Sequence, residues 1–168
     1  MLTVDLGELL RKGRLTIEGT VPSGDPLLEF PEIVLPGGLN VRLVVSPAGR
    51  DVLARGRLSG EAELECRRCL KSLRGQFDED VTLLYRSGVS ATEAEAEEVY
   101  ALPDRARQIE LGPAVREHVI LAVPQYPLCD PSCRGLCPQC GADLNRGPCG
   151  CVNRAADARW VALRKHSD

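Results

Sequence analysis

Eight cysteines are the residues of this chain best suited to chemistry, because they form four close pairs. In chain order the pairs are Cys66/Cys69, Cys129/Cys133, Cys137/Cys140 and Cys149/Cys151. Tetrahedral zinc takes four soft ligands at about 2.3 Å, and a short spacer lets one turn present two sulfurs to the ion. The spacing therefore predicts zinc as the cofactor, with up to two ions per chain and all eight cysteines as ligands.

The four pairs can be divided into two metal sites in three ways. The third and fourth pairs make the most local site, since Gly141 can adopt a positive φ beside one pair and Gly150 suits extended backbone within the other. The first pair would then share an ion with the second, because loop-closure entropy grows only slowly with separation. A reduced first pair without metal, and disulfides in a secreted chain, are the alternatives.

The cysteine-rich segment has few apolar side chains with which to bury a core of its own. Glycines and prolines recur between Cys129 and Cys151, which is typical of turns rather than of helices or strands. A structural zinc ion contributes roughly 10 kcal/mol or more to such a module. Its folding is therefore expected to depend on metal.

The sequence offers little for catalysis, so no enzyme is expected. The two histidines are His118 and His166, and neither belongs to a recognisable catalytic motif. Cys133, Cys137 and Cys140 match the cluster spacing of radical enzymes, but the large barrel that such enzymes need does not follow. All-cysteine zinc sites are typically closed, whereas catalytic zinc keeps an open position.

The composition is that of a globular protein with an aliphatic core. The 168 residues are 43% hydrophobic and 4% aromatic, with a formal net charge of −3, so the chain is not a polycation. No apolar run approaches the roughly 18 residues that a membrane span needs, and no secretion signal is recognised. The expected location is the cytoplasm, a reducing compartment in which paired cysteines usually bind metal. No membrane and no small-molecule substrate is expected as a partner.

A local basic cluster accompanies the first cysteine pair. Candidate RNA contacts are Arg67, Arg68, Lys71 and Arg74, and a metal site shared with the second pair would bring Arg134 beside them. Clustered cations on an otherwise acidic protein suit a phosphate-facing patch, although a solvated surface is the simpler interpretation.

The residue pattern predicts an α+β fold in two parts. Residues 1–124 are expected to form a β-rich main domain, with strands at 14–21 and a β meander at 41–85 that curls towards a barrel. A short helix is expected within residues 1–13, a mobile acidic linker or solvated helix face at 92–98 and a helix near 110–123. Residues 125–168 are expected to form the zinc module and a terminal helix at 154–165, packed on the main domain.

The cysteine segments together resemble the YceD family, the large ribosomal RNA subunit accumulation proteins. The residues that carry the resemblance are Cys66-Arg-Arg-Cys-Leu70, Pro127-Leu-Cys129, Cys133-Arg-Gly-Leu-Cys-Pro-Gln-Cys-Gly141, Leu144-Asn145 and Gly147-Pro-Cys-Gly-Cys151. The resemblance implies a role in processing, accumulation or early assembly of large-subunit ribosomal RNA, without catalytic activity.

The leading hypothesis is therefore a non-enzymatic ribosome-biogenesis factor. Its partner would be large-subunit ribosomal RNA or its precursor, contacted directly or through ribosomal proteins. The rival hypotheses are an RNA-processing metalloenzyme and a transcription-associated zinc adaptor.

Overall fold

The computed structural model describes residues 2–31 and 33–151, so the expected helix at 154–165 lies outside the described residues. The strands are β1 (Thr3–Asp5), β2 (Leu15–Val21), β3 (Leu39–Ala48), β4 (Asp51–Glu65), β5 (Ser72–Ser87), β6 (Tyr100–Leu102) and β7 (Gln108–Glu110). The α-helices are α1 (Leu6–Lys12), α2 (Ala91–Ala96) and α3 (Gly112–Ala122), and η1 (Pro26–Leu28) is a short 3-10 helix. The class is α+β, as predicted.

The main sheet has five strands in the order β2-β3-β4-β5-β6, and β1 pairs separately with β7. Neighbouring strands of the main sheet are antiparallel from β2 to β5, which confirms the meander, whereas β6 runs parallel to β5. The sheet remains open, because β2 and β6 form its two edges and do not pair with each other. The expectation of a barrel-like sheet was therefore wrong.

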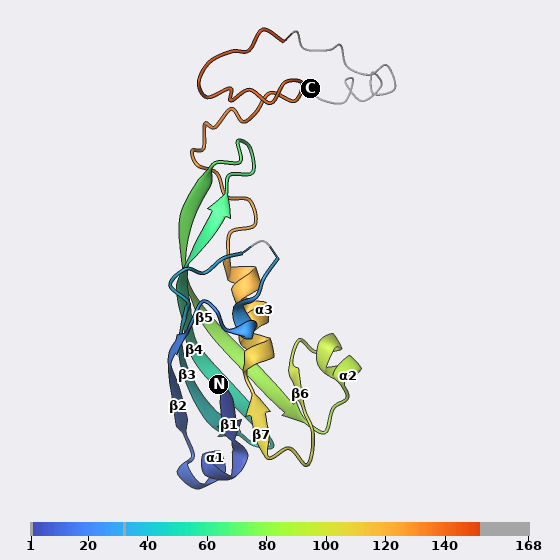
Figure 1. Cartoon of the computed structure of the whole chain (residues 1–168). Helices are drawn as coiled ribbons and strands as arrows, with labels where there is room; N and C mark the ends of the chain where they lie inside the picture. Colours follow the sequence, from blue (N-terminus) through green and yellow to red (C-terminus); the bar gives the residue numbers. More distant parts are fainter. Residues whose placement is uncertain (1, 32, 152–168) are drawn as a thin grey trace, which may run out of the picture.

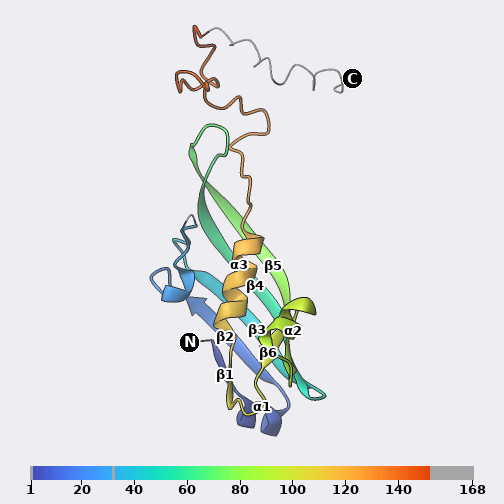
Figure 2. The same ribbon diagram turned by 90° about the vertical axis from the view of Figure 1, so that its right-hand side faces the viewer.

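One face of the sheet is buried and the other is solvated. Along β3, residues Leu39, Val41, Leu43 and Val45 are buried in alternation with more exposed residues, as the two-residue period of a strand requires. Figures 1 and 2 show α3 lying across one face of the sheet, near β1 and β7. A helical cover on one face explains why the sheet need not close on itself to bury its apolar side chains.

The β4–β5 hairpin extends well past the rest of the sheet (Figure 1). Strand β3 pairs with β4 only as far as Gly60, whereas the β4–β5 ladder continues to Glu65 and Ser72. Beyond Gly60, β4 contacts Val34 on its β3 side, through an isolated bridge between Val34 and Glu63. The hairpin therefore carries its tip, and with it the first cysteine pair, away from the body of the sheet.

The short segments around the sheet follow the sequence pattern with two differences. Helix α1 ends at Lys12 and is capped by Gly13, whose φ of 70° suits a glycine at that position. The acidic run is not a loose linker, because Ser90 and Glu93 form a capping box that starts α2. Helix α3 begins at Gly112 rather than near 110, since Ile109 belongs to β7 and pairs with Val4 of β1.

The main apolar core should survive loss of metal, because Val123 is the last described residue that belongs to it. We expect chelation of zinc, or Cys137→Ser, to remove amide protection between residues 129 and 151 while β3 and β4 keep theirs. Hydrogen exchange read by mass spectrometry checks this. Uniform loss of protection across the sheet would contradict an independent core.

Candidate metal centres

The first quartet joins the hairpin tip to a segment about sixty residues later. The sulfurs of Cys66, Cys69, Cys129 and Cys133 all lie within 4.8 Å of one another. The Sγ atoms of Cys66 and Cys133 are 3.8 Å apart, and those of Cys69 and Cys129 are 3.5 Å apart. Four sulfurs at about 2.3 Å from a tetrahedral ion are about 3.8 Å from each other, so the donor set fits zinc.

The second quartet is formed within the cysteine-rich segment. Its ligand atoms, from Cys137, Cys140, Cys149 and Cys151, also lie within 4.8 Å of one another. The grouping into quartets is the one that local spacing favoured. The second quartet is the more exposed, since Cys137 is its only buried residue, whereas Cys66 and Cys133 are both buried in the first.

The two quartets are built on the same backbone turn. In the first, the N–H of Leu70 donates to the carbonyl of Cys66 at 2.9 Å, and the N–H of Cys66 donates to the carbonyl of Lys71 at 2.9 Å. In the second, Gly141 donates to Cys137 at 2.9 Å, and Cys137 donates to Ala142 at 2.8 Å. Two turns with one hydrogen-bond pattern therefore present the leading pair of sulfurs at each site.

Each turn needs a left-handed residue directly after its second cysteine. Gly141 fills this position with φ at 73°, and Leu70 fills it with φ at 59°. Glycine adopts this conformation without steric cost, whereas a residue with a Cβ pays roughly 1 to 2 kcal/mol. Leu70 is 60% exposed, so little burial offsets that cost.

The hairpin tip also binds the cysteine-rich segment through its backbone and through Arg68. The guanidinium of Arg68 donates to the carbonyls of Cys133 at 2.8 Å and Pro131 at 3.2 Å, and the Arg68 carbonyl accepts from Leu136 N–H at 3.0 Å. A Cβ on Gly135 would lie 2.8 Å from that carbonyl, so the close approach needs glycine there. The shared quartet is thus one part of a wider contact.

Asn145 supports the first quartet from outside the ligand set. Its side-chain amide donates to the Sγ of Cys133 at 3.4 Å, while its Oδ1 accepts from the N–H of Arg134 at 2.7 Å. Groups that hydrogen-bond to ligands orient them for the metal. Spacing alone did not single out Asn145, although the Leu144-Asn145 pair belongs to the pattern that resembles YceD.

Without metal, the thiols of each quartet differ widely in acidity. The pKa of Cys66 is lowered to about 6, chiefly because the backbone N–H of Cys129 donates to its sulfur. The pKa of Cys137 is likewise lowered to about 6, chiefly by the N–H of Cys140. Neighbouring thiols instead raise the pKa of Cys129 and of Cys151 to about 12. Each quartet therefore offers one ready thiolate to an incoming cation.

The predicted RNA-contacting cations are only partly brought together. Arg74 lies across the ladder, 3.3 Å from Glu61 and 3.6 Å from Glu63. Arg67 donates to the carbonyl of Gln125 at 3.1 Å. The remaining three lie where the hairpin tip meets the cysteine-rich segment: Arg68 contacts it directly, Lys71 lies near Asp143, and Arg134 precedes Gly135.

Fold and site together define a protein with an open, largely antiparallel sheet and two all-cysteine candidate metal centres at one end. Residues 54–165 match the family model of the large ribosomal RNA subunit accumulation protein YceD. The chain therefore belongs to the YceD family, whose name gives it a ribosome-related role at the level of the family. No solved structure matches the chain.

Proteins similar to this chain include two from mycobacteria and one from a plant. An uncharacterized protein of Mycobacterium tuberculosis is 34% identical over 167 residues, covering 96% of this chain and 79% of the relative. An uncharacterized protein of Mycobacterium leprae is 29% identical over 150 residues, covering 89% of this chain and 69% of the relative. The chloroplastic large ribosomal RNA subunit accumulation protein YCED homolog 1 of Arabidopsis thaliana is 31% identical over 61 residues, covering 36% of this chain and 19% of the relative. In the described part of this chain, no helix is long and apolar enough to cross a membrane.

Loss of the first cysteine pair should remove one metal ion and leave the other. We expect Cys66→Ser/Cys69→Ser to lower the zinc content by one equivalent per chain, because the second quartet draws no ligand from the hairpin tip. Elemental analysis of purified protein checks this. Retention of the full metal content would mean that the first quartet binds no ion.

Zinc affinity should fall as the pH is lowered, and fall more steeply below about pH 6. Above that pH, Cys66 and Cys137 are already thiolates, whereas below it they too must lose a proton to bind the metal. The stability that these thiolates contribute is present at alkaline pH and is lost as the pH falls through about 6. Competition with a chromophoric chelator between pH 5 and pH 8 measures how steeply the logarithm of zinc affinity changes with pH. A slope that stays constant through pH 6 would contradict the low pKa of Cys66 and Cys137.

Substitutions at the left-handed position of the two turns, Leu70 and Gly141, should change stability in opposite directions. Leu70→Gly should leave stability unchanged or raise it by about 0.5 kcal/mol, since relief of the left-handed strain exceeds the entropic cost of glycine. Gly141→Leu should cost about 1 kcal/mol for the same reason. Thermal unfolding of the zinc-loaded chain compares the two, and a large loss in Leu70→Gly would show that this leucine serves another purpose.

Proposed function

We propose that this chain is a non-enzymatic ribosome-biogenesis factor that acts in the cytoplasm. It supports processing, accumulation or early assembly of large-subunit ribosomal RNA, and each cysteine quartet holds a structural zinc ion. Family membership supports the process, since the family is named for accumulation of that RNA.

The observation that carries the proposal is the shared quartet at the hairpin tip. Four sulfurs complete a tetrahedral zinc shell and leave no position for water or substrate, so this ion would fix structure rather than perform chemistry. What it fixes is the docking of the cysteine-rich segment against the Cys66–Leu70 turn. That docking gathers Arg68, Lys71 and Arg134 at one end of an acidic protein.

A basic end on an acidic chain is suited to modest, local contact with phosphate. Lys71 and Arg134 are exposed. Arg68 keeps its charge while it donates to backbone carbonyls, so it adds to the local potential even though it is held in place. Aromatic residues are too few for a row of stacked bases, so contact through the RNA backbone is favoured over readout of base edges.

Charge reversal at this end should weaken association with large-subunit particles. We expect Lys71→Glu/Arg134→Glu to reduce co-purification of large-subunit ribosomal RNA several-fold without changing the metal content, because neutralised phosphates release counterions on binding. Arg68 is unsuitable for this test, since its reversal would disturb the docking itself.

The matched control is Arg55→Glu, which reverses an exposed arginine on the solvated face of the sheet. Sequencing of co-purified RNA over a range of salt concentrations reads out both variants. Association that is insensitive to salt, or unaffected by the double reversal, would exclude direct phosphate contact by this basic end.

A further inference from the structure

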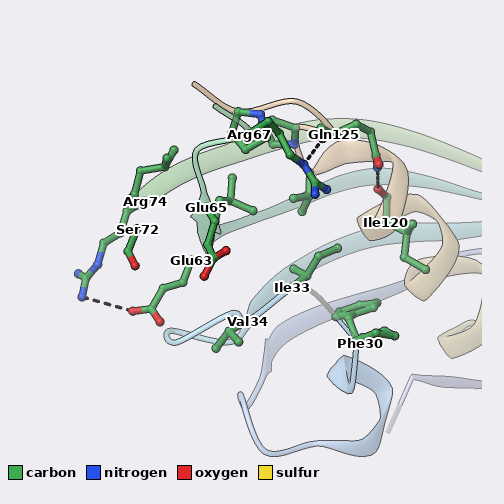
Figure 3. A pocket seen from close by; sticks show the side chains of 16 residues that line it. Phe30, Ile33, Val34, Glu63, Glu65, Arg67, Ser72, Arg74, Ile120 and Gln125 are labelled. Atoms are coloured by element: carbon green, nitrogen blue, oxygen red, sulfur yellow. Dashed lines mark hydrogen bonds and ion pairs between the residues drawn. The ribbon is translucent and has the colours of Figure 1, made fainter. Parts of the chain in front are cut away.

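Two large apolar side chains are exposed where the hairpin tip meets the cysteine-rich segment. Leu70 belongs to the turn that carries the first cysteine pair and is 60% exposed, and Tyr126 precedes Cys129 in the docked segment and is 84% exposed. Neither belongs to the apolar core of the described residues. Neither lines the nearby groove of about 1130 Å³ that Figure 3 shows. Burial within the described chain therefore does not account for these two side chains.

Leu70 occupies a position that suits glycine. Its φ of 59° is left-handed, and the matched turn of the second quartet has Gly141 at the same place. The N–H of Leu70 donates to the Cys66 carbonyl at 2.9 Å, so the cysteine turn holds this conformation. Strained backbone of this kind clusters at ligand-binding sites. The exposed Leu70 side chain is therefore best explained by contact with a partner.

The backbone on both sides of Tyr126 is held by Arg67. The N–H of Arg67 donates to the Pro127 carbonyl at 2.9 Å. Its Nε donates to the Gln125 carbonyl at 3.1 Å, as Figure 3 shows. Tyr126 also precedes a proline, which restricts its own backbone to extended conformations. A tyrosine ring on a backbone held in this way loses little entropy when a flat ligand stacks on it.

The charges around these two residues are mainly positive. The cations of the turn and of the docked segment are Arg67, Arg68, Lys71, Arg134 and Arg146. The acids are Asp130, Asp143 and, just before the turn, Glu65, which lines the groove. The two aspartates already accept hydrogen bonds within the segment, from Ser132 and from Asn145. A partner suited to this end therefore combines negative charge with flat or apolar groups.

We propose that this end binds unpaired nucleotides of single-stranded RNA. One base stacks on Tyr126, another packs against Leu70, and the phosphates lie among the cations. An unpaired strand offers base faces and phosphates together, whereas the bases of duplex RNA are stacked on one another and inaccessible. This inference rests on the proposed function, and it names loops or single strands as the parts of the ribosomal RNA that are contacted.

The first measurement compares two forms of one RNA on the full zinc-loaded chain. A fluorescent single-stranded oligoribonucleotide is titrated alone and after annealing to its complement. The single strand should bind about tenfold more tightly than the duplex, although the duplex has the higher density of phosphates. Equal binding, or tighter binding of the duplex, overturns this inference and leaves phosphate contact by the basic end intact.

Tyr126→Ala and Tyr126→Phe test the stacking. The alanine variant should bind the single strand about tenfold more weakly, which is the usual effect of losing one base stack. The phenylalanine variant keeps the ring and should keep the affinity. No loss in the alanine variant, or an equal loss in both, overturns the stacking role of Tyr126.

Leu70→Gly and Leu70→Asn test the apolar contact and keep the turn, because both residues accept a left-handed backbone. Each should weaken binding of the single strand several-fold while zinc content and thermal stability are retained. The matched control is Leu10→Ala, since Leu10 is 72% exposed on α1, at the opposite end of the molecule from the hairpin tip (Figure 1). Equal effects at Leu70 and Leu10 overturn the role of Leu70.

Salt dependence separates this inference from the proposed function. Tyr126→Ala and Leu70→Gly remove no phosphate contact, so they should lower the affinity without changing the slope of log affinity against log salt concentration. Lys71→Glu/Arg134→Glu should instead reduce that slope. A single strand that binds with the full slope but is indifferent to both apolar substitutions overturns this inference alone. Failure of the intact chain to bind any RNA overturns direct RNA contact as well.

An acidic protein segment is the competing partner. In that case Tyr126→Ala and Leu70→Gly would weaken association with large-subunit particles and leave binding of the naked single strand unchanged. That result would overturn the assignment of this surface to RNA.

Discussion

The arrangement of this molecule depends on one shared cysteine quartet, to which the hairpin tip supplies two thiols and a segment about sixty residues later supplies two more. Closing the loop between these two segments costs little entropy, since each doubling of loop length adds only about 0.6 kcal/mol to the free energy of closure. A structural zinc ion held by this quartet would contribute roughly 10 kcal/mol or more, far above the cost of closing the loop. The main core ends at Val123, and the described chain beyond it gains its order from the cysteines and the hydrogen bonds around them.

The long hairpin explains what a metal ion in the first quartet would stabilise. Beyond Gly60 the hairpin has lost β3 as a neighbour, and a two-stranded ribbon alone is marginally stable in water. Docking against the cysteine-rich segment at its tip, and against Val34 along its edge, compensates for the missing strand. The same extension carries the first cysteine pair to the hairpin tip, so the position of the first quartet follows from this mismatch in strand length.

Local chemistry made much of this structure predictable from sequence. Cysteine spacing gave the grouping of both quartets, and the alternation of apolar residues gave the buried face of β3 and β5. The capping box of Ser90 and Glu93 was not used in reading the sequence, because the acidic composition of the run indicated a solvated segment. Open or closed topology could not be foreseen, since it depends on α3 covering one face of the sheet.

Contacts between distant segments were the least predictable. Arg68 looked like a free cation, yet its guanidinium is held by the carbonyls of Pro131 and Cys133. Asn145 looked like a loop residue, yet its amide reaches the Cys133 sulfur. In both cases the partner is a group whose position is fixed only after the quartet has assembled, so no pattern along the chain could reveal it.

Zinc K-edge X-ray absorption on the full chain, purified without chelator, reads the ligands of each ion directly. We expect two zinc ions per chain, each with four sulfur neighbours at about 2.3 Å and no nitrogen or oxygen ligand. A single ion, a mixed sulfur and oxygen shell, or an iron signal would contradict it.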